Sequence, residues 1–183
     1  MSELEKKDIS TEYAPSKTLA SCFEWVSAGM VALAMVCILF AVFFRQVTVD
    51  GDSMYSTLEN GDRLLISDFM YEPDYGDIVV IRRDNDTPLI KRVIGLPGDT
   101  VYINPKTGVV YRNGEALQED YVYGGFTPNN GLKSEITVEE DTIFVMGDNR
   151  CASLDSRALG CLQQDHLVGR VIYRFTPNRG KVE

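Results

Sequence analysis

The longest uninterrupted run of apolar residues lies near the N-terminus. From Trp25 to Phe44 the chain reads WVSAGMVALAMVCILFAVFF, which is 20 residues without a charged side chain. A helix needs about 20 apolar residues to cross a hydrocarbon core of ~30 Å. A helix buried in a soluble core rarely stays apolar on every face for this length. The pattern therefore predicts one membrane-spanning helix over residues 22–44.

A cleaved signal peptide is the main alternative to a retained membrane helix. Its apolar region has only ~7–15 residues and ends in a small-x-small cleavage site. Here the run is longer, and it is followed by Arg45-Gln46-Val47-Thr48, where no such site occurs. The pattern therefore favours an uncleaved signal-anchor.

Charges on the two flanks of this helix indicate its orientation. Lys6, Lys7 and Lys17 precede it, whereas Arg45 is the only cation that follows it before Arg63. Cytoplasmic flanks carry an excess of Lys and Arg. We therefore expect residues 1–21 to form a cytoplasmic tail, and the rest of the chain to lie outside the cell (plasma) membrane, which it crosses once.

Beyond the helix, short β-type runs alternate with turn residues. No stretch after residue 50 keeps a helical apolar period for three turns. The pattern predicts a mainly β domain over residues 45–183, arranged as a folded-over, barrel-like sheet, with a smaller inserted β region at about 100–141. The runs expected to form strands are 78–82, 89–94, 100–103, 109–111, 142–146 and 167–175.

Composition narrows the classes of function. The net charge of −9 argues against nucleic acid as a partner, because neutralising phosphates requires a basic surface. The single histidine, His166, excludes a metal site built on two histidines, and we expect it to be a surface or structural residue. We expect neither a metal nor a cofactor. Cys151 and Cys161 are equally compatible with a disulfide and with two free thiols. Cys22 and Cys37 lie in or beside the membrane helix.

Ser53 and Lys91 offer a nucleophile and a base that need no histidine. Ser53 lies in a Gly-containing turn just after the helix, and Lys91 interrupts an apolar strand. In a regular strand Lys91 shares one face with Leu89 and Val93, where burial would lower its pKa. A serine hydroxyl becomes an effective nucleophile when such a base accepts its proton. For an isolated pair, an exposed lysine and a serine that caps a turn would be the simpler interpretation.

Four motifs around this pair make the functional interpretation specific. They are GDSMYSTL at 51–58, YGDIVV at 75–80, KRVIGLPGD at 91–99 and GDNRCASLDSR at 147–157. In this order they closely resemble the bacterial type I signal peptidases of the Ser/Lys-dyad prokaryotic type. These are membrane-anchored serine proteases that remove signal peptides from exported proteins. With the preceding helix, the resemblance covers nearly the whole chain.

The resemblance implies a role for each matching residue. Ser53 would be the nucleophile, with its backbone N–H in the oxyanion hole, and Lys91 would be the general base. Ser153 would hydrogen-bond and orient the lysine amine, and Asp155 and Arg157 would form an acid–base pair that supports Ser153. No metal or cofactor is required. Three further residues of the last motif are expected to shape the adjacent turn: Gly147, Asp148 and Asn149.

The resemblance also implies the substrate, a preprotein with small residues at the first and third positions before the cut. Ser53 follows the helix so closely that it must act near the membrane lipid. We expect an extended substrate to pair with the strand that carries Lys91. Phe69, Met70 and Tyr71 are equally compatible with the lipid interface and with core packing. The residues expected to line the substrate pockets are Met54, Leu58, Leu89 and Ile90.

The sequence departs from the family pattern in three respects. Ser56 occupies a position where the family usually has proline, which predicts a looser turn behind the nucleophile. Gly51 occupies a position where some relatives have a serine whose hydroxyl completes the oxyanion hole, so the second donor is unassigned. Cys151 and Ala152 replace more polar residues.

Two other classes of function are compatible with a membrane helix and a β domain. A sortase-like cysteine transpeptidase would use Cys161, His166 and an arginine, but the cysteine precedes the histidine and lacks a TLxTC-type context. An inert membrane-anchored β module would not need both Ser53 and Lys91. Self-cleaving Ser/Lys repressors share a similar dyad, but they carry a DNA-binding domain where this chain has a membrane helix.

Overall fold

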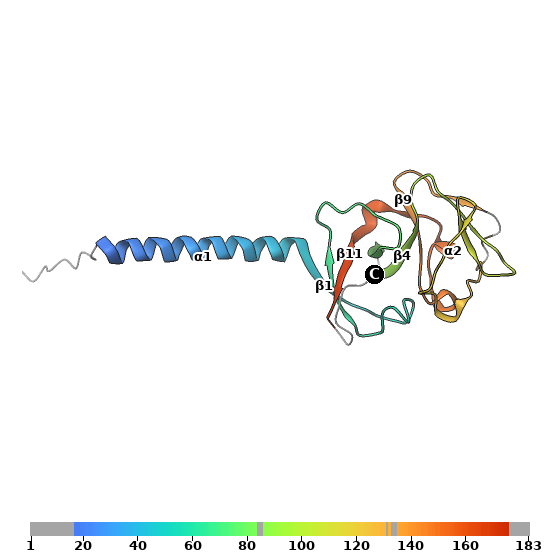
Figure 1. Cartoon of the computed structure of the whole chain (residues 1–183), viewed down its shortest axis with the longest axis horizontal. Coiled ribbons are helices and arrows are strands. Elements are labelled where there is room, and N and C mark those ends of the chain that lie inside the picture. Colours follow the sequence, from blue (N-terminus) through green and yellow to red (C-terminus); the bar gives the residue numbers. More distant parts are fainter. Residues whose placement is uncertain (1–16, 84–85, 131, 133–134, 176–183) are drawn as a thin grey trace, which may run out of the picture. The chain divides into compact units, whose positions relative to one another are not determined.

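The protein is described by a computed structural model that covers residues 17–83, 86–130, 132 and 135–175. The described residues form two compact units, which meet between Ala41 and Val42 in the sequence. Figure 1 shows the elements along the chain. The helices are α1 (Lys17–Phe43) and α2 (Ser156–Leu159), and the short 3₁₀ turns are η1 (Tyr123–Gly125), η2 (Arg150–Ala152) and η3 (Gln164–His166). The strands are β1 (Phe44–Thr48), β2 (Arg63–Ser67), β3 (Ile78–Arg83), β4 (Asp86–Gly95), β5 (Thr100–Ile103), β6 (Val110–Arg112), β7 (Glu115–Ala116), β8 (Ile136–Thr137), β9 (Thr142–Met146), β10 (Leu162–Gln163) and β11 (Leu167–Arg174).

Helix α1 has the properties expected of a membrane-spanning segment. Its part from Ser21 to Phe43 is long and apolar enough to cross a bilayer, and its large apolar side chains are exposed. A helix that is apolar on all faces needs an apolar surrounding along its whole length. The helix begins earlier than predicted and ends at Phe43, because Phe44 already starts β1.

The second unit is built from two antiparallel sheets, which confirms the mainly β prediction. The large sheet has the strand order β1-β2-β11-β3-β4-β9-β10, and the small sheet has the order β7-β6-β5-β8. The small sheet lies between Thr100 and Thr137, inside the region predicted as an insertion. In the described part of the chain the end strands β1 and β10 do not pair with each other, so a closed barrel stays a prediction.

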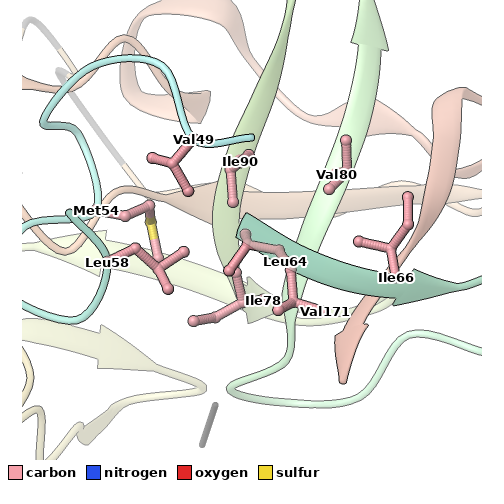
Figure 2. Packing of buried hydrophobic residues seen from close by; sticks show 9 residues of the cluster. All are labelled: Val49, Met54, Leu58, Leu64, Ile66, Ile78, Val80, Ile90 and Val171. Carbon is pink, nitrogen blue, oxygen red and sulfur yellow. The ribbon is translucent and has the colours of Figure 1, made fainter. Parts of the chain in front are cut away.

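Three clusters of buried apolar side chains form the core of this unit. The first cluster joins the turn after β1 to strands β2, β3, β4 and β11 (Figure 2). The second joins the small sheet to β9, and the third lies around β3 and β9. Burying one large aliphatic side chain contributes roughly 1.5–3 kcal/mol. The members of the first cluster are Val49, Met54, Leu58, Leu64, Ile66, Ile78, Val80, Ile90 and Val171.

The apolar residues of the β2–β3 loop differ in their exposure. Phe69 and Met70 are 57% and 87% exposed, and the Phe69 ring meets the Phe43 ring edge-on at 4.6 Å. Tyr71 instead packs against the third core cluster. Of the two alternatives, core packing therefore applies to Tyr71 alone, and contact of Phe69 and Met70 with lipid stays a prediction.

Candidate active site

Ser53 lies on the turn that connects β1 and β2. The two ends of this turn are joined where the Val49 N–H donates to the Asp62 carbonyl at 2.8 Å. Met54 and Leu58 on the same turn are buried in the first core cluster (Figure 2). Two apolar anchors within six residues hold the turn against the sheet, so the position of Ser53 is set by the core.

Lys91 lies in β4, opposite Val79 of β3, and its side chain reaches Ser53. It is only 2% exposed, as expected from its apolar neighbours. Its Nζ donates to Ser53 Oγ at 2.7 Å and to the Ile90 carbonyl at 2.9 Å. Burial lowers the pKa of Lys91 to about 8, although the charges of Asp155 and Asp148 oppose the shift. A substantial fraction of the amine is therefore neutral near pH 8 and able to accept a proton.

A groove with a volume of about 290 Å³ opens beside this pair. Residues 47–50 at the end of β1 form one part of its wall, and residues 87–91 of β4 form another. Ser53, Met54 and Arg83 complete the lining. Strands from distant parts of the sequence thus meet where the nucleophile lies.

Three of the four predicted lining residues border this groove, namely Met54, Leu89 and Ile90. The prediction for Leu58 is wrong: its side chain is 0% exposed and belongs to the first core cluster (Figure 2). Leu58 follows Met54 by one helical turn, since the Leu58 N–H donates to the Met54 carbonyl at 2.8 Å, and both side chains point into the core. The wall contributed by residues 47–50 was not predicted, because it depends on the long-range position of β1.

Two strand edges that lack a neighbouring strand in the described part of the chain border the groove. Residues 89–91 of β4 pair with β3, whereas β9 pairs with β4 only from Arg92 to Gly95. Strand β1 pairs only with β2 in the part of the chain that is described. An extended peptide can add to such edges through main-chain hydrogen bonds.

The loop after β9 holds the backbone of the nucleophile turn. The Asn149 N–H donates to the Ser53 carbonyl at 3.0 Å, and Asn149 Nδ2 donates to the Asp52 carbonyl at 3.1 Å. Gly147 lies so close that a Cβ there would overlap the Ser53 carbonyl and Ser153 Oγ. The turn therefore accepts no side chain at position 147. The turn-shaping role expected for Gly147 and Asn149 has this physical basis.

A buried ion pair fixes the same loop to β4. Arg92 Nε and Nη2 donate to the two oxygens of Asp148 at 2.9 and 2.8 Å, and both side chains are at most 3% exposed. Thr57 Oγ1 also donates to Asp148, and Arg92 Nη1 donates to the Gly76 carbonyl at 2.8 Å. Arg92 was not predicted as a site residue, although it directly follows Lys91 in the sequence.

Asp155 and Arg157 form a second buried ion pair, as the resemblance implies. Arg157 Nε and Nη2 each donate to one oxygen of Asp155 at 2.8 Å, and neither side chain is exposed. The Gly147 N–H donates to Asp155 at 3.1 Å, and Arg157 also donates to the Pro128 carbonyl. Burial acts to raise the pKa of Asp155, but the hydrogen bonds and charge of Arg157 outweigh it and hold this pKa below its usual range. The carboxylate is therefore charged.

Ser153 does not make the hydrogen bond to Lys91 that the resemblance implies. Its Oγ is buried and makes no well-formed hydrogen bond in the part of the chain that is described, although its hydroxyl helps to hold the pKa of Asp155 low. The Lys91 amine instead bonds to Ser53 and to the Ile90 carbonyl. Ser153 packs beside Gly147, so it borders the nucleophile turn without orienting the lysine in this structure.

The residues of the cysteine transpeptidase alternative do not form a reactive site. Cys161 is half-buried against the second core cluster, and burial raises the pKa of its thiol. A buried thiol of this kind is a poor nucleophile. His166 lies in η3, where Asp165 is the acidic residue 3.8 Å from its Nε2. Cys151 and Cys161 are free thiols, so of the two alternatives for this pair the structure has the unbonded one.

Comparison with known proteins identifies the family. The profile of the family described as "Signal peptidase, peptidase S26" matches residues 22–176. The chain belongs to this signal peptidase family. The family inferred from the four motifs is thereby confirmed, and with it the class of enzyme, a serine endopeptidase.

Individual S26 relatives are similar over most of their length. A probable signal peptidase I-1 from Synechocystis sp. is 39% identical over 160 residues, covering 81% of this chain and 79% of the relative. Signal peptidase I S from Bacillus subtilis is 36% identical, covering 86% and 90%. A crystal structure of a signal peptidase I from Enterococcus faecalis V583 is 32% identical with a TM-score of 0.45, covering 55% of this chain and 97% of that one.

Proposed function

We propose that this chain is a membrane-anchored endopeptidase that removes N-terminal signal peptides from exported preproteins with a Ser53/Lys91 dyad. The observation that supports it most is the 2.7 Å contact between Lys91 Nζ and Ser53 Oγ. The amine at this contact is buried, and its lowered pKa makes it a base near neutral pH. Membership of the S26 family supports the same chemistry.

The reaction follows from the positions of these two groups. The neutral Lys91 amine accepts the proton of Ser53 Oγ while the oxygen attacks the scissile carbonyl. The resulting ammonium then donates a proton to the leaving amine, which departs and leaves an acyl-enzyme on Ser53. In the second half Lys91 accepts a proton from water while the water oxygen attacks the ester carbonyl. The Ser53 Oγ–acyl bond then breaks, the Lys91 ammonium returns the proton to Ser53 Oγ, and the signal peptide leaves with a new carboxyl end.

The charge on the tetrahedral intermediate is stabilised by donors on the nucleophile turn. The Ser53 N–H is the first donor, and one well-placed donor lowers the barrier by roughly 3–4 kcal/mol. Gly51 offers no hydroxyl, and its φ of +91° is a conformation that other residues rarely adopt. A second donor must therefore come from backbone or water.

The groove suits an extended peptide with small side chains. Residues 89–91, which have no described strand partner on the side away from β3, and the end of β1 flank a bound peptide on two sides, with the Ile90 carbonyl already accepting from Lys91 Nζ. Met54 and Ile90 line the groove but are almost completely buried in the core. Only shallow space is therefore left for substrate side chains beside Ser53. This supports small residues at the first and third positions before the cut.

The membrane position of the site follows from the chain around α1. Lysines precede the helix, and β1 begins directly where it ends. We place α1 in the cell membrane with the N-terminus in the cytoplasm and the β unit outside. Preproteins and membrane lipid are then the partners, and the cleavage site of a membrane-inserted signal peptide lies within reach of Ser53.

The proposal is tested by cleavage of a preprotein that carries an Ala-x-Ala site. The full-length chain in detergent is expected to produce one new N-terminus directly after the second alanine, and Ser53→Ala none, because Ser53 forms the acyl bond. Intact mass spectrometry identifies the products. Ser67→Ala, in β2 and outside the groove, serves as the matched control. A cut by Ser53→Ala at the wild-type rate, or no cut by folded wild-type protein, would contradict the proposal.

Activity is expected to rise with pH through the pKa of Lys91. Because the neutral amine is the base and burial lowers its pKa to about 8, the charged, inactive form dominates at pH 6–7. We expect kcat/KM to increase about tenfold per pH unit below pH ~7.5 and to level off above pH ~9. Initial rates on a peptide substrate between pH 6 and 10 measure this profile. A rate that is flat or falls over this range would be inconsistent with lysine as the base.

A further inference from the structure

Tyr55 and Tyr123 form an aromatic pair beside the nucleophile. Tyr55 follows Ser53 by two residues, and its ring meets the Tyr123 ring edge-on with centroids 4.9 Å apart. The two residues are 37% and 50% exposed, and neither lines the groove. This tyrosine pair therefore borders Ser53 outside the groove of β1 and β4.

Tyr123 is held in place by the loop that also holds the nucleophile. The Tyr123 N–H donates to the Asp148 carbonyl at 3.0 Å. Asn149, which follows Asp148 in the chain, donates to the Ser53 carbonyl. Gly124 follows with a φ of +77°, which lets the chain turn away directly after the ring. Tyr123 and the nucleophile are thus held by two adjacent residues of one loop, Asp148 and Asn149.

The segment that leads to Tyr123 is anchored at two more points. Arg150 forms an ion pair with Glu119 at 2.6 Å, in which the two side chains are 0% and 9% exposed. The Arg92 guanidinium lies 4.0 Å from the centre of the Tyr121 ring. Rings that are exposed and yet fixed by buried contacts lose little entropy when they bind a partner. The arrangement favours recognition of a ligand over core packing.

We propose that the tyrosine pair is the subsite for the first residues of the mature protein, those that follow the scissile bond. This inference rests on the proposed function, in which the groove of β1 and β4 takes the signal-peptide side. The part of the substrate that follows the scissile bond must then extend away from Ser53 on the side outside the groove, where the tyrosine pair lies.

The distance from Ser53 to the tyrosine pair matches the length of a short extended peptide. Two residues of chain place the Tyr55 Cα within ~7 Å of the Ser53 Cα. An extended substrate advances ~3.3 Å per residue, so its second or third residue after the cut meets the rings. Tyrosine offers flat apolar area together with a hydroxyl that can bond to a peptide carbonyl. The subsite therefore favours extended mature segments with flat or apolar side chains at these positions.

Photo-crosslinking tests the location without requiring turnover. A peptide with an Ala-x-Ala site and a benzophenone side chain on the second residue after it is irradiated with full-length Ser53→Ala. Peptide mapping is expected to find the label in residues 54–57 or 119–126. Labelling in residues 47–50 or 87–91, or in neither pair of segments, overturns the inference.

Kinetics test whether the pair contributes to specificity. Two substrates share one Ala-x-Ala sequence and carry either one or five residues after the cut. Tyr123→Ala is expected to lower kcat/KM about tenfold on the long substrate and less than about twofold on the short one. Tyr123→Phe keeps most of the activity because the ring remains.

Tyr102→Ala is the matched control, since Tyr102 is 38% exposed and pairs with Tyr111 on the small sheet. Equal losses on both substrates, or no loss on the long one, overturn the inference. If the wild-type protein cuts neither substrate after its second alanine, the proposed function fails instead, and the crosslinking result still locates the mature segment.

Discussion

Replacing Lys91 with methionine is expected to lower kcat/KM by at least about 10³-fold while the fold is retained. The substitution removes the only amine within hydrogen-bond distance of Ser53 Oγ in the described part of the chain, where it lies at 2.7 Å. Methionine has a similar length and fills the buried space without a polar group. Burying the Lys91 amine costs free energy, because the amine loses its water. Removing it is therefore expected to leave Tm unchanged or to raise it.

The comparison that isolates the amine uses Lys106→Met. Lys106 is an exposed lysine in the loop between β5 and β6 and is not part of the groove lining. Peptide cleavage rates and thermal unfolding of both variants are measured in the same detergent. A Lys91→Met variant that is folded and retains more than a few per cent of wild-type activity would exclude Lys91 as the base.

Replacing Asp155 with asparagine is expected to lower the free energy of unfolding by about 3–5 kcal/mol, because it leaves the Arg157 guanidinium buried without a counter-charge. Both side chains of this pair are fully buried, and the carboxylate also accepts from the Gly147 N–H. Total stabilities are about 5–15 kcal/mol, so a large part of the stability would be lost. Activity should fall as well, since Gly147 touches the nucleophile turn.

Circular dichroism in the strand region is the suitable probe for this variant. The single tryptophan, Trp25, lies in α1 and does not report on the β unit. Asp165→Asn, an exposed acidic residue beside His166, should leave the unfolding curve unchanged. Asp155→Leu combined with Arg157→Met removes both charges and should recover much of the loss. An Asp155→Asn variant as stable as wild type would show that the pair contributes little to the fold.

Each of the six strand runs expected from the sequence overlaps a strand of the structure, because in these runs local β-branched residues and long-range burial favour the same conformation. Five strands were not predicted, namely β1, β2 and the two-residue strands β7, β8 and β10. Strand β1 follows the membrane helix directly and contains Arg45 and Gln46, so nothing in its local pattern separates it from the end of the helix. It is a strand because it pairs with β2 from Phe44 to Thr48, and such a register is a long-range property.

Site residues that belong to a specific motif could be predicted from the sequence, whereas those that depend on long-range packing could not. Ser53 and Lys91 occur in specific motifs, and the apolar neighbours of Lys91 already indicated its burial. Leu58 was misplaced because an apolar residue near a nucleophile can face either the substrate or the core, and the turn directs it into the core. The ion pair of Arg92 with Asp148 joins residues 56 positions apart, and no local pattern reveals such a contact.

Acylation of Ser53 is the most direct readout of its activation by the Lys91 amine. Full-length wild-type protein and Lys91→Met are mixed with a peptide ester that has alanine at the acyl position, and the adduct is followed by intact mass and located by peptide mapping. We predict an adduct on Ser53 of the wild type, formed faster as the pH rises towards the Lys91 pKa of about 8, and no adduct on Lys91→Met in the same time. An adduct on another residue, or equal rates for the two proteins, would contradict the account.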